Sequence, residues 1–185
     1  MEIANLDLKV LRKGDTCRCK WLLLIMQSRS IWDESLLQSI THFLGTIDYL
    51  GPFQHFTNTT YYQSEFGSNL WRAWLGIREL GDPSQLLVKK KICTALEEKE
   101  AVNGCRKYNI DVGYLDPDKL VLASWKRGPN KLYLGDGIWA DVQFNYSKGI
   151  FIPTRWAFPD LNNQVYLRDL KILREKLKAK MRKED

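Results

Sequence analysis

The stretch "NKLYLGDGIWADVQFNYSKGIFIP", residues 130–153, decides the fold class. A Gly-Asp-Gly turn at 135–137 separates two runs of strand-forming residues, as in a tight β-hairpin. Apolar and polar residues then alternate over 138–146, and a second turn at 147–149 leads into a third strand. Alternation with a period of two is typical of an antiparallel sheet with one buried face. The segment is therefore predicted to be an antiparallel meander.

Helices and strands are also indicated upstream of this meander. Residues 21–27 form a continuous apolar run of strand length, as expected for a buried central strand. A helix is predicted between Ser30, as its N-cap, and Gly45. A second helix should begin after Asp82, because a capping Asp followed by Pro is typical of a helix start. Its predicted outer face carries three lysines, and Val88 is predicted to face inward.

For other segments, the residues do not distinguish a helix from a regular strand. Residues 46–56 read as a strand interrupted by Gly-Pro, which indicates a sheet edge or a bulge. Residues 70–80 and 116–126 fit either a strand or a helix. The last segment, 166–183, has leucines at helical spacing and predicts an amphipathic helix.

These elements predict an α+β fold. We expect a mainly antiparallel sheet with helices packed on one face, and a C-terminal meander followed by a basic amphipathic helix. Residues 1–20 are expected to be an irregular lead-in, and residues 21–185 a single domain. Oligomeric state is not determined by any pattern in the chain.

The charge of the chain is concentrated in one segment. The 185 residues contain 44% hydrophobic and 27% charged side chains, as in ordinary globular proteins, and carry a net charge of +6. Residues 166–183 hold eight cations and two carboxylates, which accounts for the whole excess. The segment is either a helix docked by its apolar side or a polyanion-binding surface. The cations proposed for that surface are Arg168, Lys171, Arg174 and Lys178.

Several classes of protein are excluded or disfavoured. The N-terminal residues lack the apolar core of a signal peptide, and the longest apolar run is too short to cross a bilayer, so a cytoplasmic protein is expected. No P-loop, dinucleotide-binding turn, serine nucleophile elbow or H-E-x-x-H is present. The two histidines and four cysteines match no zinc spacing, so no metal site is expected. Whether the protein binds a cofactor is left open.

A group of polar residues suggests a binding site. Asn109 and Asp111 are two apart, so they share one face of a predicted strand whose other face is apolar. Asp141 lies on the polar side of the meander, and Lys126 and Arg127 precede a Gly-Pro turn. Such groups could act as a base or bind an anion. They could equally be solvated side chains on ordinary strands and loops.

The segment 59–67 adds aromatic and acidic groups. Tyr61 and Tyr62 precede Glu65 and Gly67 in a polar stretch that could close over a cleft. The two tyrosines could instead cover the edge of the core.

Three functional hypotheses follow. The leading one is a cleft that binds an anionic ligand, a nucleotide or RNA. Whether any residue of this cleft is catalytic is left open. A second is an RNA-binding or ribonucleoprotein-associated module that uses the basic C-terminal helix. A third is a metal-assisted enzyme that uses Asp111, Glu65 or Asp141. Whether the chain is an enzyme is left open.

Five motifs, in order, resemble one protein family. They are "TTYYQSEFG", "YNIDVGYL", "KLVLASWKR", "KLYLGDGIWADV" and "WAFPD", and the chain is similar from Trp21 onward to the bacterial and archaeal domain-of-unknown-function family 4416. The resemblance implies a single domain of about this length but no established activity. Some members carry a generic GTP-binding label. The resemblance directs attention to Tyr61, Tyr62, Glu65, Gly67, Asn109, Asp111, Gly113, Tyr114, Lys126, Tyr133, Gly135 and Gly137.

This chain departs from the family pattern at two places. Asn130 and Lys131 stand where the family usually has His-Arg, and Asp141 stands where it has a Glu-type acid. Any mechanism based on that histidine is therefore not expected here.

Overall fold

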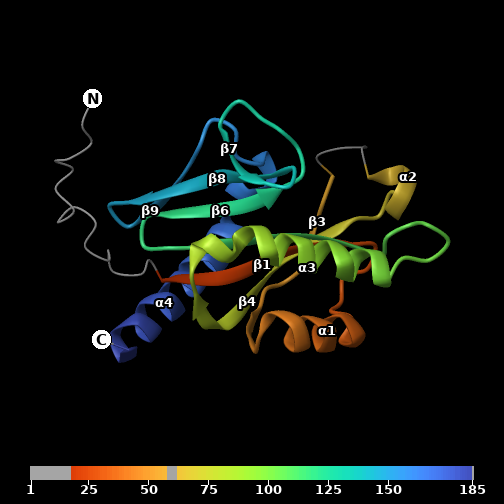
Figure 1. Cartoon of the computed structure of the whole chain (residues 1–185). Helices are drawn as coiled ribbons and strands as arrows, with labels where there is room; N and C mark the ends of the chain where they lie inside the picture. The colour runs from red at the N-terminus through yellow and green to blue at the C-terminus, as the bar shows by residue number, and fades with distance from the viewer. Residues whose placement is uncertain (1–17, 58–61, 185) are drawn as a thin grey trace, which may run out of the picture.

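A computed structural model describes residues 18–57 and 62–184 (Figure 1). The strands are β1 (Cys19–Gln27), β2 (Ile47–Leu50), β3 (Gln54–His55), β4 (Trp71–Gly81), β5 (Tyr108–Leu115), β6 (Lys119–Ser124), β7 (Lys131–Gly135), β8 (Ile138–Ser147) and β9 (Ile150–Pro153). The helices are α1 (Glu34–Leu44), α2 (Gln63–Phe66), α3 (Leu86–Lys99) and α4 (Gln164–Glu184), with short 3-10 turns η2 (Pro83–Gln85) and η3 (Pro159–Asn162). The predicted α+β class is confirmed.

The strands form one antiparallel sheet. Its order is β2-β4-β1-β5-β6-β8-β7, while β3 also pairs with β4 and β9 with β8. Both segments of uncertain type, around β4 and β6, are strands. Because β1 lies between β4 and β5, Leu24 sits opposite Trp74 on one side and Asp111 on the other.

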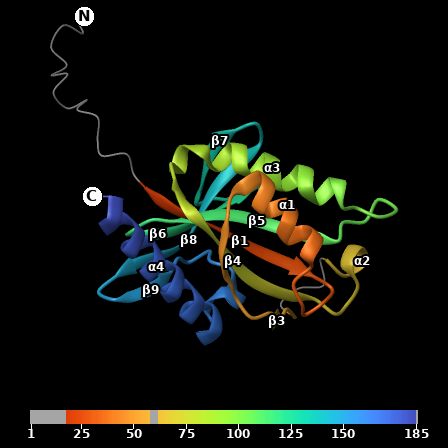
Figure 2. The ribbon, with the colours of Figure 1, turned by 90° about the horizontal axis from the view of Figure 1, so that it is seen from below.

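The helices cover both faces of this sheet rather than one. Leu23 and Ile25 of β1 pack in a core with α1 and α3, whereas Leu22 and Leu24 pack against α4. Figure 2 shows α1 and α3 on one side of β1 and α4 on the other. The expected one-sided cover therefore needs correction. Every residue of β1 is buried, so this strand presents apolar side chains in both directions and both must be covered.

The basic C-terminal helix follows the meander, as predicted, and docks by its apolar stripe. Leu170, Leu173 and Leu177 are fully buried. A Cβ on Gly76 of β4 would lie 2.4 Å from Leu173, so the helix rests directly on the strand backbone. Tyr166 Oη donates to the Arg72 carbonyl at 2.9 Å. The described part of the chain contains no helix long and apolar enough to span a membrane.

The meander contains both predicted turns and an irregularity within β8. Asp136–Gly137 and Lys148–Gly149 have positive φ at both central positions, as tight hairpins require. The predicted alternation breaks at Gln143, because Val121 pairs with Val142 but Leu120 pairs with Phe144. This bulge turns Phe144 toward α4, whereas Ile138 faces the α1 and α3 side. The expected single buried face is thus wrong beyond Gln143.

Two further boundaries differ from prediction. The N-cap of α1 is Asp33 rather than Ser30, because Asp33 Oδ1 accepts from the Ser35 and Leu36 amides. β1 begins at Cys19, inside the expected lead-in, and residues 1–17 lie outside the described part of the chain. Asp82 caps the turn η2 ahead of α3, as predicted.

Candidate functional site

The strands β5 and β6 separate along the sheet and leave a fork. They pair only at three positions, from Gly113 opposite Leu122 to Leu115 opposite Leu120. β6 nevertheless continues to Ser124, where it pairs with β8. At the closed end of the fork, a Cβ on Gly113 would lie 2.2 Å from the Val121 carbonyl oxygen, so only glycine allows this approach. The half of β5 before Gly113 therefore has a free edge in the described sheet.

Two buried side chains of α3 occupy this free edge in place of a strand. The Ile110 amide donates to Glu97 Oε1, and Lys90 Nζ donates to the Ile110 carbonyl at 2.9 Å. Burial raises the pKa of Glu97. The prediction for this helix was wrong in two places: Lys90 is 3% exposed and faces inward, while Val88 is 55% exposed.

Asn109 and Asp111 lie side by side in the fork, as their spacing predicts. Asn109 Nδ2 donates to Asp111 Oδ2 at 3.0 Å. The same oxygen lies 3.1 Å from an Arg72 terminal nitrogen, and the other oxygen lies 3.7 Å from Lys90 Nζ. Arg72 is also bonded to Asp160 and lies between the rings of Phe56 and Phe158. Asp111 is thus held within a network of charged groups.

Arg106 connects Glu65 to the same network. Its guanidinium makes two bonds to the Glu65 carboxylate, at 2.7 and 2.8 Å. It also donates to Glu97 at 2.9 Å and to Asn109 at 3.3 Å. Hydrogen bonds from Arg106 lower the pKa of Glu65 below its ordinary value. Glu65, a catalytic candidate, therefore serves as an anchor for Arg106.

Asp141 reaches the site through Lys131. Lys131 Nζ lies 3.0 Å from Asp141 Oδ2 and 3.0 Å from Ser124 Oγ. Asn130 also donates to Asp141, at 3.4 Å, and Asp141 is buried. The residues at which this chain departs from the family pattern are therefore in contact, because Asn130 and Lys131 both bond to Asp141.

These groups surround a cavity of about 270 Å³, which we call the fork cleft. Its charged lining consists of Lys90, Glu97, Arg106, Asp111, Lys126 and Lys131. Its neutral lining consists of Tyr62, Asn109, Ser124, Trp125 and Phe158. Four of the predicted site residues, Tyr62, Asn109, Asp111 and Lys126, therefore line one cavity, with Glu65 and Asp141 bonded directly behind it.

Two other candidates do not reach the fork cleft. Arg127 is exposed and does not line it. Tyr133 packs on Trp139, with ring centroids 4.9 Å apart, and its hydroxyl accepts from the Gly137 amide. Tyr133 therefore belongs to the hairpin, where the alternation of the strand places it. Tyr61 lies outside the described residues.

The sequence missed four cations of this region: Arg72, Lys90, Arg106 and Lys131. The burial of Lys90 could have been predicted from its spacing. It lies four residues after Leu86 and three before Cys93, on the buried face of α3. Glu97 continues the same row. For Arg72, Arg106 and Lys131 no local pattern marks the role, since their partners lie in other elements of the fold.

The catalytic candidates are each paired with a cation rather than with one another. Asp111 is bonded to Arg72, Glu65 to Arg106 and Asp141 to Lys131. Across residues 18–57 and 62–184, no three His, Cys, Asp or Glu side chains are placed to hold a metal ion together.

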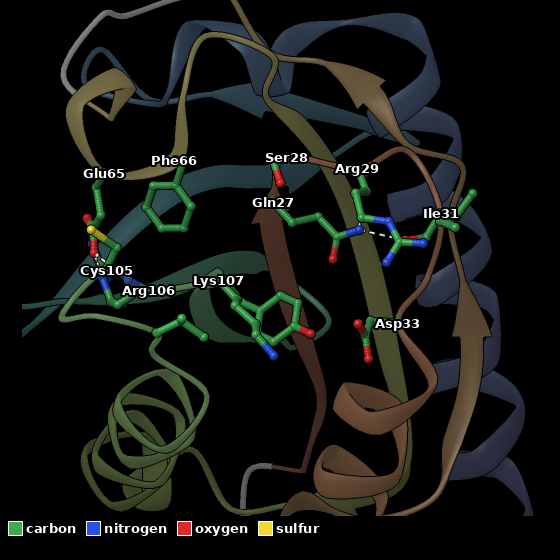
Figure 3. A pocket seen from close by; sticks show the side chains of 12 residues that line it. Gln27, Ser28, Arg29, Ile31, Asp33, Glu65, Phe66, Cys105, Arg106 and Lys107 are labelled. Carbon is green, nitrogen blue, oxygen red and sulfur yellow. Dashed lines mark hydrogen bonds and ion pairs between the residues drawn. The ribbon is translucent and has the colours of Figure 1, made fainter.

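A second and larger cavity, of about 380 Å³, lies at the end of β1 and is called the end pocket (Figure 3). Figure 3 shows Glu65, Phe66, Cys105 and Arg106 on one wall and Arg29, Ile31 and Asp33 on the opposite one. Arg106 lines both cavities and therefore separates them. Of the predicted site residues that the structure describes, the catalytic candidate Glu65 lines the end pocket, whereas Tyr62, Asn109, Lys126, Arg127 and Tyr133 do not.

The basic helix α4 uses part of its charge within the molecule. Arg174 lies 3.7 Å from the centre of the Tyr146 ring and donates to the Pro117 carbonyl, and Lys178 is bonded to Glu175. Arg168 and Lys171 are exposed. Of the four cations proposed for a polyanion-binding surface, Arg174 and Lys178 therefore also make contacts within the molecule.

Comparison with known families identifies the chain. The family model described as "Domain of unknown function (DUF4416)" matches residues 19–177, from the start of β1 into α4. A comparison with curated proteins and another with solved structures found no match. The matched range contains the sheet and both cavities, and it covers most of the chain. The protein therefore belongs to the DUF4416 family of domains of unknown function.

Proposed function

We propose that the protein binds an anionic ligand of the nucleotide class in the fork cleft. The observation that carries the proposal is the composition of the lining, in which four cationic side chains stand against two carboxylates beside three aromatic rings. A lining with excess positive charge favours a phosphate or carboxylate. Aromatic rings in the same cavity offer faces for a planar base.

The cations of the cleft differ in how exposed they are. Lys90 and Arg106 are held by Ile110, Glu97 and Glu65, so their role is to fix the cavity. Lys126 is exposed at the rim, and Lys131 is held from behind by Asp141. The rim is therefore where an incoming phosphate would first meet positive charge.

The aromatic groups are placed for stacking. Trp125 is 46% exposed, and its indole nitrogen donates to Thr94 Oγ1 at 3.0 Å, which ties the ring to α3. Phe158 also lines the cleft and packs against Arg72. Stacking of a base on such a ring contributes about 1–3 kcal/mol in known nucleic-acid complexes.

Isothermal titration with nucleoside mono-, di- and triphosphates tests the proposal. Lys126→Ala and Trp125→Ala should each weaken binding about 10-fold or more, because one removes rim charge and the other a stacking face. Both side chains are exposed, so the fold should survive. Asp111→Asn is a less clean test, since it disturbs the Arg72 pair.

Lys171→Ala is the matched control, because it removes the same charge from the exposed face of α4. It should leave nucleotide binding unchanged. The proposal is wrong if no nucleotide binds at millimolar concentration, or if the two cleft variants bind as well as the unaltered protein.

A second candidate function is RNA binding through α4, favoured by the exposure of Arg168 and Lys171. Binding that falls steeply with salt and is lost in Lys171→Ala but retained in Lys126→Ala would identify this surface instead. A cytoplasmic location is likewise proposed, from the sequence pattern alone.

A further inference from the structure

The end pocket contains a buried hydrogen-bond acceptor that the protein leaves unused. Gln27, the last residue of β1, is 3% exposed and lines this pocket. Its carboxamide oxygen, Oε1, has no hydrogen-bond partner among the described residues. Buried polar atoms are nearly always paired, so an unpaired oxygen beside a cavity indicates a place for a donor.

The orientation of this carboxamide is fixed by the backbone. Gln27 Nε2 donates to the Arg29 carbonyl at 2.8 Å and to the Ile31 carbonyl at 2.6 Å, which uses both of its hydrogens. Rotating the amide by half a turn would set its oxygen against two carbonyl oxygens. The oxygen is therefore held on the other side, and Figure 3 shows it directed into the pocket between Lys107 and Asp33.

The acids around the pocket already have donors from the protein. Asp33 accepts from the Ser35 and Leu36 amides at the start of α1, and Glu65 is bonded to Arg106. Neither is available as the main acceptor for a ligand. Gln27 Oε1, by contrast, is a buried acceptor without a donor from the described residues, so it can accept from a donor group of a bound molecule.

Part of the lining of the pocket is apolar. Phe66 and Tyr108 present aromatic side chains, and Ile31 and Val102 present aliphatic ones. The volume of about 380 Å³ is within the range of small-molecule sites. A planar ring between such walls, with one polar edge toward Gln27, would bury its faces and satisfy the oxygen.

We infer that the end pocket binds a flat nitrogen heterocycle, of the nucleobase class, whose N–H group donates to Gln27 Oε1. A ring that offers only an acceptor at this edge is rejected, because two facing lone pairs repel and the oxygen stays unpaired. This site is distinct from the fork cleft, and the inference does not rest on the proposed function.

Cys105 provides a local readout of binding. It is exposed and lines the end pocket, whereas Cys19 and Cys93 are buried. Burial also raises the pKa of Cys93 to about 12, which makes its thiol unreactive. Cys17 lies outside the described residues, so the experiment uses the full chain with Cys17→Ser. The rate of Cys105 alkylation then reports occupancy of the end pocket.

Two matched pairs of nucleosides serve as test ligands. Adenosine is compared with purine riboside, which lacks the amino group, and uridine with its ring-N-methylated form, which lacks the ring N–H. In at least one pair, the donor-bearing nucleoside should protect Cys105 at a concentration about 10-fold lower than its partner. The inference is overturned if no nucleoside protects Cys105, or if both members of each pair protect equally.

Two variants test whether the difference between donor-bearing and donor-lacking nucleosides arises at Gln27 Oε1 in the end pocket. Gln27→Met keeps the volume of the side chain and removes the oxygen, so the difference within the pair should disappear. If this variant does not fold, the comparison within each pair still decides the outcome. Lys126→Ala, in the fork cleft, should leave protection of Cys105 unchanged, and loss of protection in that variant would count against a separate site.

Discussion

β1 and β5 are neighbours in the sheet, but only β1 has a strand beside it along both edges. β1 pairs with β4 and β5 over nearly its whole length and is buried throughout. β5 pairs with β1 in the same way, but it meets β6 at only three positions. The free half of β5 carries Asn109 and Asp111, and charged side chains fill the space beside it. In β5, the polar residues Asn109 and Asp111 thus lie in the half of the strand that has no second strand partner.

The largest expected effect comes from weakening the fully paired region. Leu24 is completely buried at the centre of β1, so Leu24→Ala should lower the free energy of unfolding by about 2–5 kcal/mol. Urea denaturation measures this change. Leu132→Ala is the control, because Leu132 is 69% exposed and its loss should change stability by less than about 0.5 kcal/mol. Equal effects at the two positions would contradict the assignment of the core.

The second prediction tests whether α3 replaces the missing strand. Lys90→Met removes the buried donor to the Ile110 carbonyl, and should lower the free energy of unfolding by about 2–3 kcal/mol. Lys91→Met, the adjacent residue, breaks an exposed pair with Asp136 and should cost no more than about 1 kcal/mol. Thermal or urea melts of the two variants measure the difference. A smaller loss in Lys90→Met than in Lys91→Met would refute the role given to α3.

The smallest expected effect concerns pH. Bonds from Arg106 lower the pKa of Glu65 from its ordinary value of 4.5. A carboxylate with a lowered pKa stabilises the fold above its unfolded pKa, and this contribution is lost as the pH falls through the folded value. Glu65→Gln should therefore cost about 1 kcal/mol at pH 7, and the difference should shrink as the pH is lowered past 4.5.

Urea melts of Glu65→Gln and the unaltered protein across this pH range give the measurement. Asp136→Asn is a suitable control, since Asp136 is an exposed carboxylate that pairs with Lys91 rather than with Arg106. A cost that is the same at acid and neutral pH would show that charge on Glu65 does not hold Arg106.

The sequence predicted those parts of the fold that depend on local chemistry. The turn at Asp136–Gly137 requires positive φ, and the residues there allow it, so the hairpin could be recognised without the rest of the chain. Asn109 and Asp111 share a face because strand geometry requires it. The continuous apolar run of β1 also indicates that both faces of the sheet must be covered.

The remaining features depend on distant contacts. The bulge at Gln143 could not be recognised from the sequence, because no glycine or other turn residue stands at that position. The fork arises where β6 stops pairing with β5, and this divergence is set by α3 and by the close approach at Gly113. Arg106 joins Glu65, Glu97 and Asn109 only because three separate elements meet there. No pattern in one segment could show that meeting.

Side chains of α3 take the place of a neighbouring strand beside β5, and this also affects how the backbone amide protons of β5 exchange with water. In an ordinary sheet, an amide proton is protected by a carbonyl of the neighbouring strand. At Ile110 it is protected by the Glu97 carboxylate, whose pKa is raised by burial. Hydrogen exchange at this one amide therefore follows the docking of α3, while exchange at the β1 amides follows the opening of the whole sheet. One backbone proton thus distinguishes local opening of the fork from unfolding of the domain.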